Sequence, residues 1–336
     1  MKKALFIMIL LANLQFRAQS LKMISSSTKT KVMEVLKTES RVPGLKIAIS
    51  HVAPKTILND SPILLLHGSS FPSDLSFGFR MDNSSWMSNL SENGYDVYAL
   101  DFLGYGNSDR YPEMKTTSSK IVGRASEVYL DVDKAVNYIL AKTGKKKIYL
   151  LGHSWGGSVA ALYASKMSEK VEKLVLFATI TARNENSEYE TVDQSFEVMT
   201  PLQRINAMKS LTPEGKKCQL EPEIFTNWAE IWKKSDPLTT DSKNSFVRYP
   251  SGPSADVQDL LHNNSYYDPK KITAKTMIIR GEWDIYPDNN DAEGLFIALE
   301  NTVSIKYVVL QKGTHVMQLE KGRKDLYRET LNFLKE

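Results

Sequence analysis

Five short, almost wholly apolar runs constrain what this chain can fold into. They cover residues 62–66, 95–100, 148–151, 174–177 and 277–279, and a less uniform sixth run covers 303–310. Runs of this length and composition are typical of strands that are buried on both faces. Helical patterns alternate with them at residues 84–93, 125–141, 158–167, 291–299 and 325–334. The alternation predicts right-handed strand–helix–strand units and a mostly parallel sheet with helices on both faces.

Two further regions depart from this alternation. Residues 31–37 and 45–50 carry strand-like patterns around the turn Pro43-Gly44, which predicts an antiparallel edge. Residues 182–271 hold seven prolines between amphipathic pieces and no buried-strand pattern. We therefore predict a core of residues 21–181 and 272–336, with a helical cap, residues 182–271, inserted between strands 6 and 7.

The first twenty residues resemble a secretory signal peptide. Lys2 and Lys3 precede an apolar run at 4–14, and Ala18-Gln19-Ser20 offers small residues at the cleavage positions. The run is too short for a comfortable membrane span. We expect cleavage after residue 20, export to the periplasm or beyond, and no stable membrane anchor afterwards. An uncleaved anchor and a buried N-terminal helix are the alternatives.

Charge and cysteine content exclude several function classes. The formal net charge is +4, and three of the basic residues lie in the leader, so the remainder carries +1. This does not indicate a nucleic-acid partner. Cys218 is the single cysteine, which excludes intramolecular disulfides and multi-cysteine metal sites. The sequence gives no indication of the oligomeric state.

A candidate nucleophile follows the third buried run. The sequence there reads Gly152-His153-Ser154-Trp155-Gly156-Gly157 and leads into a helical pattern. A Gly-x-Ser-x-Gly between strand and helix forms a sharp turn that presents the serine oxygen above the sheet. Glycines flank the serine because the tight backbone leaves no room for side chains. We predict Ser154 as the nucleophile, against the alternative of a structural glycine turn.

A serine hydroxyl needs a base, and the chain holds five histidines. In this type of site the order along the chain is serine, acid, histidine, which leaves His262 and His315. His262 falls in the predicted cap, whereas His315 follows the last strand in Gly313-Thr314-His315. We predict His315 as the base.

The acid is expected after the run at 277–279, where the sequence reads Arg280-Gly281-Glu282-Trp283-Asp284. We predict Asp284, because Gly281 lets the loop turn its carboxylate toward the histidine. Glu282 is the alternative. Asp291 is interpreted as a residue at the start of a helix.

Backbone N–H groups and aromatic side chains complete the predicted site. Trp155 N–H and Ser69 N–H are the expected oxyanion donors, with Ser70 as an alternative to Ser69. His67 is interpreted as a structural residue beneath that loop. Aromatic residues from the loop after His67-Gly68, the cap and the acid loop are candidates for the pocket wall: Phe71, Phe77, Trp228, Trp232 and Trp283.

No cofactor or metal is predicted. Gly104-Tyr105-Gly106 follows a buried run but has Asp109 where a dinucleotide fingerprint needs its third glycine. The sequence also has no His-Glu-x-x-His, no phosphate-loop motif and no calcium loop.

These motifs together resemble those of the α/β-hydrolase family, from about residue 31 to the C-terminus. Five segments match in the family's order: His67-Gly68, residues 101–108, residues 152–157, Gly281-Glu282-Trp283-Asp284 and Gly313-Thr314-His315. The resemblance implies the α/β-hydrolase fold with a cap. Members that cleave epoxides or carbon–halogen bonds look different, since they use aspartate where this chain has Ser154. Proline iminopeptidases share the Gly-x-Ser-Trp-Gly turn but carry a longer glycine–proline loop in place of Ser69-Ser70-Phe71-Pro72.

The expected activity is hydrolysis of a small-molecule carboxylic ester with a small or medium apolar acyl or alcohol group, through an acyl-enzyme. Amide, lactone or carbon–carbon bond hydrolysis by the same three residues, including a proline iminopeptidase-like activity, is the enzymatic alternative. A non-catalytic binding protein on the same fold is the alternative from another class.

Overall fold

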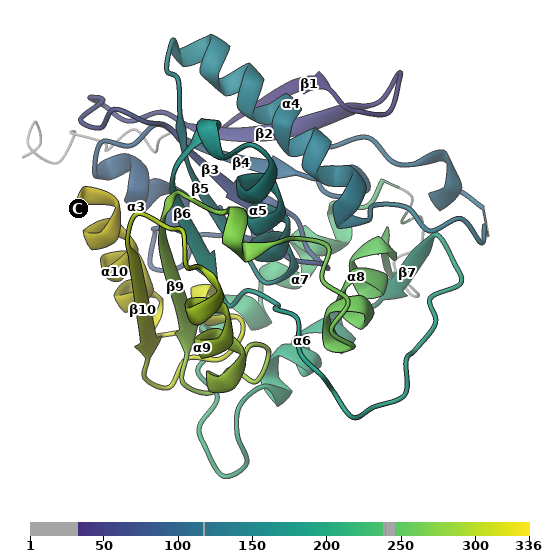
Figure 1. Ribbon diagram of the computed structural model, residues 1–336. Helices are drawn as coiled ribbons and strands as arrows, with labels where there is room; N and C mark the ends of the chain where they lie inside the picture. Colours follow the sequence, from purple (N-terminus) through teal and green to yellow (C-terminus); the bar gives the residue numbers. More distant parts are fainter. Residues whose placement is uncertain (1–32, 117, 238, 240–245) are drawn as a thin grey trace, which may run out of the picture. The chain divides into compact units, whose positions relative to one another are not determined.

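The computed structural model describes residues 33–116, 118–237, 239 and 246–336; the predicted signal peptide, residues 1–20, lies outside them. An eight-stranded sheet runs in the order β1-β2-β4-β3-β5-β6-β9-β10 (Figure 1). Its strands are β1 (Glu34–Glu39), β2 (Lys46–Val52), β3 (Ile63–Leu66), β4 (Val97–Asp101), β5 (Ile148–His153), β6 (Val171–Phe177), β9 (Lys275–Gly281) and β10 (Ile305–Leu310). Strand β2 pairs antiparallel with β1 and β4, and the other neighbours are parallel. The predicted mostly parallel sheet is confirmed.

Helices cover both faces of this sheet because successive side chains of a strand point to opposite sides. Leu64 and Leu66 of β3 belong to one apolar cluster and Leu65 to a second. The first cluster includes residues of α4 (Ala125–Thr143), α5 (Trp155–Lys166) and α9 (Asn289–Ala298). The second includes residues of α3 (Trp86–Glu92) and α10 (Arg323–Lys335). Both faces are therefore buried, which explains the unbroken apolar runs in the sequence.

A long insertion, residues 178–274, separates β6 from β9, close to the predicted range of 182–271. It contains α6 (Pro201–Ser210), α7 (Trp228–Lys234) and α8 (Gly252–Leu261), and the two-stranded sheet of β7 (Phe196–Met199) and β8 (Val247–Pro250). These two strands have no counterpart in the sequence prediction. Each has four residues, β7 is only partly buried, and β8 ends in a proline, so neither gives a buried-strand pattern.

The remaining elements are short. They are α2 (Ser73–Ser76) and the 3₁₀ helices η1 (Pro112–Met114), η2 (Ser168–Lys170), η3 (Pro222–Phe225), η4 (Pro269–Lys271) and η5 (Met317–Leu319). Helix α2 joins the core to the insertion, because the indole N–H of Trp228 donates to the carbonyl of Leu75 at 3.3 Å. Within the described ranges, every helix is too short or too polar to cross a bilayer.

Gly156 is a position where the fold tolerates no side chain. A Cβ there would lie 2.1 Å from the carbonyl oxygen of His67 and 2.6 Å from that of Leu66. Both contacts are backbone atoms, so rotation of a side chain cannot relieve them. We expect Gly156→Ala to lower the free energy of unfolding in urea by about 3 kcal/mol.

Gly294 provides the matched control. It is exposed in α9, and a Cβ there would meet nothing within 4 Å. Gly294→Ala should raise the free energy of unfolding by about 0.5–1 kcal/mol, because alanine restricts the unfolded chain. Equal effects of the two substitutions would contradict the steric argument.

Candidate active site

Three side chains meet above the carboxyl ends of β5, β9 and β10. Ser154 follows β5, Asp284 lies in the loop after β9, and His315 lies in the loop after β10. The Nε2 atom of His315 is 2.7 Å from Ser154 Oγ, and its Nδ1 atom is 3.1 and 3.2 Å from the Asp284 carboxylate oxygens. The structure thus brings together the predicted nucleophile, base and acid in one hydrogen-bonded chain.

Ser154 adopts a strained backbone conformation with φ 57° and ψ −127°. A positive φ costs a non-glycine residue about 1–3 kcal/mol and persists only when the surroundings enforce it. The N–H of Ser154 donates to the carbonyl of Phe177, and its own carbonyl accepts from the N–H of Gly157, each at 2.9 Å. The close packing of Gly152 and Gly156 completes the constraint, since a Cβ on Gly152 would lie 2.3 Å from the carbonyl of Gly156.

Two buried residues fix the loop that carries His315. Glu320 accepts hydrogen bonds from the N–H of Thr314 at 3.0 Å and from its hydroxyl at 2.6 Å. The Nε2 atom of His153 is 2.8 Å from the carbonyl of His315. Burial lowers the pKa of His153 well below its ordinary value, and the neighbouring His315 lowers it further. His153 is therefore a neutral imidazole that donates to the backbone of the base.

Sequence reasoning missed both of these supporting roles. His153 stood inside the serine motif as a position without a role, and Glu320 lies in a stretch with no motif at all. For Glu320 the sequence holds no signal, because its role depends on the return of the chain after the histidine loop.

A buried arginine holds the acid loop. The guanidinium of Arg280 donates to the carbonyl of Asp284 at 2.5 Å and to that of Pro287 at 2.9 Å. The Asp284 carboxylate also accepts from the N–H of Tyr286 at 2.9 Å. The side chain of Asp284 is fully buried. It therefore faces His315 in surroundings of low dielectric constant, which strengthen the electrostatic interaction between them.

The alternatives for acid and base lie elsewhere. Glu282 accepts from the N–H of Lys312 on the adjacent loop. Asp291 belongs to the N-terminal capping box of α9 and pairs with Arg183. His262, at the end of α8, lies within hydrogen-bond distance of the carbonyls of Gln258 and Ser187.

The expected oxyanion donors lie beside the serine. A Cβ on Gly68 would lie 3.2 Å from the Cβ of Ser154, so the backbone leading to Ser69 runs directly past the hydroxyl. Trp155 is the first residue of α5, and the first N–H groups of a helix have no hydrogen-bond partner within that helix. The carbonyl of Ser69 accepts from Tyr105 at 2.5 Å, which fixes the peptide that carries the N–H of Ser70, the alternative donor. His67 lies beneath this loop, with its Nδ1 atom 2.7 Å from the Gly68 carbonyl.

The predicted pocket aromatics divide into separate groups. Phe71 packs edge-to-face against Trp228 with ring centroids 5.1 Å apart, and Trp232 lies 5.5 Å from Trp228. Phe77 does not join them, because it lies in the second apolar cluster against Trp86 of α3. Trp283 is partly exposed, and its backbone N–H donates to the carbonyl of Gly313.

A buried carboxylate ties the insertion to the serine turn. Asp256 of α8 accepts from the indole N–H of Trp155 at 2.8 Å and from the N–H of Ala125 at 2.6 Å. Its other oxygen pairs with Arg124 at 2.6 Å. Burial raises the pKa of Asp256 to about 6, although these partners act in the opposite direction. Nothing in the sequence singles out this aspartate, because its three partners are distant along the chain.

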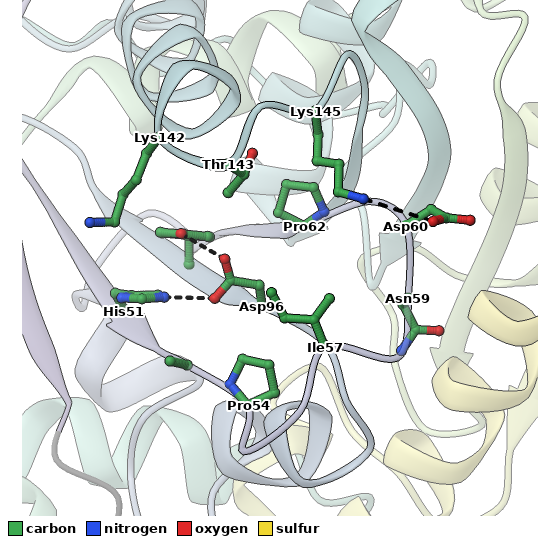
Figure 2. A pocket seen from close by; sticks show the side chains of 12 residues that line it. His51, Pro54, Ile57, Asn59, Asp60, Pro62, Asp96, Lys142, Thr143 and Lys145 are labelled. Atoms are coloured by element: carbon green, nitrogen blue, oxygen red, sulfur yellow. Dashed lines mark hydrogen bonds and ion pairs between the residues drawn. The ribbon is translucent and has the colours of Figure 1, made fainter.

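Two hollows lie away from these residues. One, of about 350 Å³, is shown in Figure 2 and lies at the amino ends of β3 and β4. Ser154 follows the carboxyl end of β5, so it lies at the other end of these parallel strands. Figure 2 shows His51 paired with Asp96 in this hollow and Lys145 paired with Asp60. A second, of about 550 Å³, lies between Pro72–Leu75, residues 106–110 and the end of α7. Neither is lined by Ser154, Asp284 or His315.

The arrangement at Ser154 suits acyl transfer. The Nε2 atom of His315 is placed to accept the serine proton while Asp284 holds its Nδ1 side. Within the residues that the structure describes, there is no group of three His, Cys, Asp or Glu side chains placed to hold a metal ion.

Glu320 predicts a pH dependence of stability. Burial raises the pKa of this carboxyl from 4.5 to about 7, and the Thr314 hydrogen bonds counteract this only in part. Between these two values the folded protein keeps a proton that the unfolded chain has lost. The contribution of Glu320 to stability therefore falls as the pH rises from about 4.5 to about 7, by about 3 kcal/mol in total at about 1.4 kcal/mol per pKa unit.

Glu320→Gln should remove the pH-dependent contribution of Glu320 to the free energy of unfolding. Urea unfolding of the two proteins, compared between about pH 4 and about pH 8, should show the wild type losing stability relative to the variant across that window. A difference between them that is constant with pH would contradict the raised pKa.

Comparisons with known proteins agree with the fold. The family model described as alpha/beta hydrolase fold matches residues 61–322. The chain is 27% identical over 269 residues to epoxide hydrolase 4 of Mus musculus, covering 76% of this chain and 68% of that protein. It is also 27% identical over 111 residues to lysosomal acid lipase/cholesteryl ester hydrolase of Rattus norvegicus, covering 30% of this chain and 28% of that protein.

Solved structures give the same result. An esterase from Exiguobacterium antarcticum superposes with a TM-score of 0.58 at 19% identity, covering 90% of this chain and all of that one. A serine hydrolase from a Cycloclasticus bacterium superposes with a TM-score of 0.60 at 16% identity, covering 90% of this chain and 98% of that one. Because the family model spans most of the sequence, the chain belongs to the α/β-hydrolase fold family.

Proposed function

We propose that this protein is a serine hydrolase that cleaves a carboxylic ester with a small or medium apolar acyl or alcohol group. The observation that carries the proposal is the hydrogen-bonded chain from Ser154 through His315 to Asp284. A nucleophile within 2.7 Å of a base, which is itself held by a buried carboxylate, is the arrangement required for covalent catalysis.

In the proposed reaction, Ser154 Oγ attacks the ester carbonyl while His315 Nε2 takes its proton. The resulting oxyanion accepts hydrogen bonds from Trp155 N–H and Ser69 N–H. Collapse of this intermediate, with protonation of the leaving alcohol by His315, gives an acyl-enzyme. Water that has lost a proton to His315 then attacks the acyl carbon and releases the acid. Asp284 stabilises the imidazolium in both steps.

The relatives support hydrolysis but differ in the bond that they cleave. Their names include an epoxide hydrolase, a cholesteryl ester hydrolase and esterases. Ser154 favours the ester-cleaving members, since the epoxide-cleaving members of the family use aspartate at the nucleophile position. An acyl-enzyme on a serine is also the route by which amides and lactones are cleaved, so substrate profiling has to include both, together with carbon–carbon substrates.

Labelling with a fluorophosphonate probe tests the nucleophile. Wild-type protein should be labelled and should hydrolyse a chain-length series of nitrophenyl esters, whereas Ser154→Ala should lose both while unfolding normally in urea. Ser165→Ala is the matched control, because Ser165 lies in α5, the helix that follows Ser154, with its hydroxyl bound to the carbonyl of Leu162. Ester turnover by purified Ser154→Ala would overturn the proposal. Ser154-dependent labelling without ester turnover would redirect it to amides, lactones or carbon–carbon bonds.

The acid is tested by Asp284→Asn. An amide cannot stabilise the imidazolium, so kcat for esters should fall by about 10⁴-fold with little change in KM. Glu282→Gln is the control, because Glu282 binds Lys312 rather than His315 and should leave kcat within a few fold. A larger fall in kcat for Glu282→Gln than for Asp284→Asn would assign the role of the acid to Glu282 instead of Asp284.

A further inference from the structure

In the part of the chain that the structure describes, Arg204 of α6 carries a guanidinium without a counter-ion. In the described part of the chain, no hydrogen bond and no ion pair involves its side-chain nitrogens, and its Nε atom is buried without a partner. Burial lowers the pKa of Arg204, and the neighbouring Tyr249 does not offset this. Tyr249 is itself neutral, since burial raises its pKa. The side chain as a whole is only partly buried. Its buried Nε–H lacks a partner, which is costly, and a bound carboxylate or phosphate would supply one.

The guanidinium of Arg204 packs on the loop that follows the expected oxyanion donor Ser69. Its Cζ atom is 5.2 Å from the centroid of Phe71, two residues beyond the expected oxyanion donor Ser69. Its charge contributes to lowering the pKa of His153, the residue that precedes Ser154. The hydroxyl of Tyr105 donates to the carbonyl of Ser69 in the same loop. Arg204 therefore contacts the oxyanion loop at Phe71, and its charge acts on His153, although it comes from a helix of the insertion.

We propose that Arg204 binds a carboxylate carried by the substrate, so that the preferred ester is one whose acyl or alcohol part bears a negative charge remote from the scissile bond. This inference rests on the proposed function and names its substrate class. A carboxylate matches the fork of one guanidinium in a bidentate pair. The guanidinium supplies a single positive charge, which matches one carboxylate.

The kinetic test uses pairs of esters that differ only in this charge. Mono-nitrophenyl esters of straight-chain dicarboxylic acids are compared with the same esters methylated at the remote carboxylate. At the best chain length, wild type should favour the anionic ester in kcat/KM by about 10- to 100-fold. In Arg204→Met this ratio should fall to about one, mainly through KM. Arg204→Lys should give an intermediate ratio, because it keeps the charge but loses the fork.

Arg328→Met is the matched control for loss of one positive charge. Arg328 lies exposed on α10, paired with Asp325 and Glu329, and such surface pairs contribute little. This variant should keep the wild-type ratio. Thermal unfolding gives a second measurement: Arg204→Met should not lower Tm, because methionine removes an unpaired charge at similar volume. A lower Tm together with an unchanged ester ratio would make Arg204 a packing residue on Phe71 and overturn the inference.

A binding measurement separates failure of this inference from failure of the proposed function. Calorimetric titration with the straight-chain dicarboxylates should show binding to wild type that Arg204→Met weakens by about 10-fold or more. Equal binding to both proteins would overturn the carboxylate site, whatever the ester kinetics. Arg204-dependent binding without Ser154-dependent labelling would retain the carboxylate site and remove the proposed hydrolase activity.

Discussion

The backbone of Gly156 lies against the carbonyl oxygens of Leu66 and His67, and the other features of the site follow from this contact. It brings the turn after β5 and the loop after β3 into direct packing. The same approach places Gly68 beside the Cβ of Ser154, so that the expected oxyanion donors and the nucleophile come from two adjacent strands. A parallel sheet makes this possible, because the carboxyl ends of β3 and β5 lie at one edge.

Buried polar residues then set the orientation of the three reacting side chains. Glu320 binds Thr314, His153 binds the backbone of His315, and Arg280 binds the backbone of Asp284. Each contact includes the main chain of the loop, and none is to the reacting atoms. Such partners hold a base and its acid in position before substrate arrives, which is the main requirement for electrostatic stabilisation of a transition state.

The sequence predicted the parallel sheet and the meeting of Ser154, Asp284 and His315, because both depend on local patterns: short apolar runs and the residues directly after them. It did not predict β7 and β8, whose four-residue strands carry no periodic signal. Phe77 was expected in the pocket on account of its loop, but α2 turns it toward Trp86. Asp256 and Arg204 were missed for the same physical reason. Their importance comes from long-range contacts of the insertion, which no single-sequence pattern records.

Asp256 also limits how far the insertion behaves as an independent module. Its carboxylate binds Trp155 of the serine turn, the N-terminus of α4 and Arg124 at once. An exchange of the insertion for that of another family member would therefore leave the indole N–H of Trp155 and the N–H of Ala125 buried without a partner unless the donor supplied an equivalent acid. Chimeras of this protein are accordingly better joined on the N-terminal side of α8, leaving Gly252–Leu261 with the host.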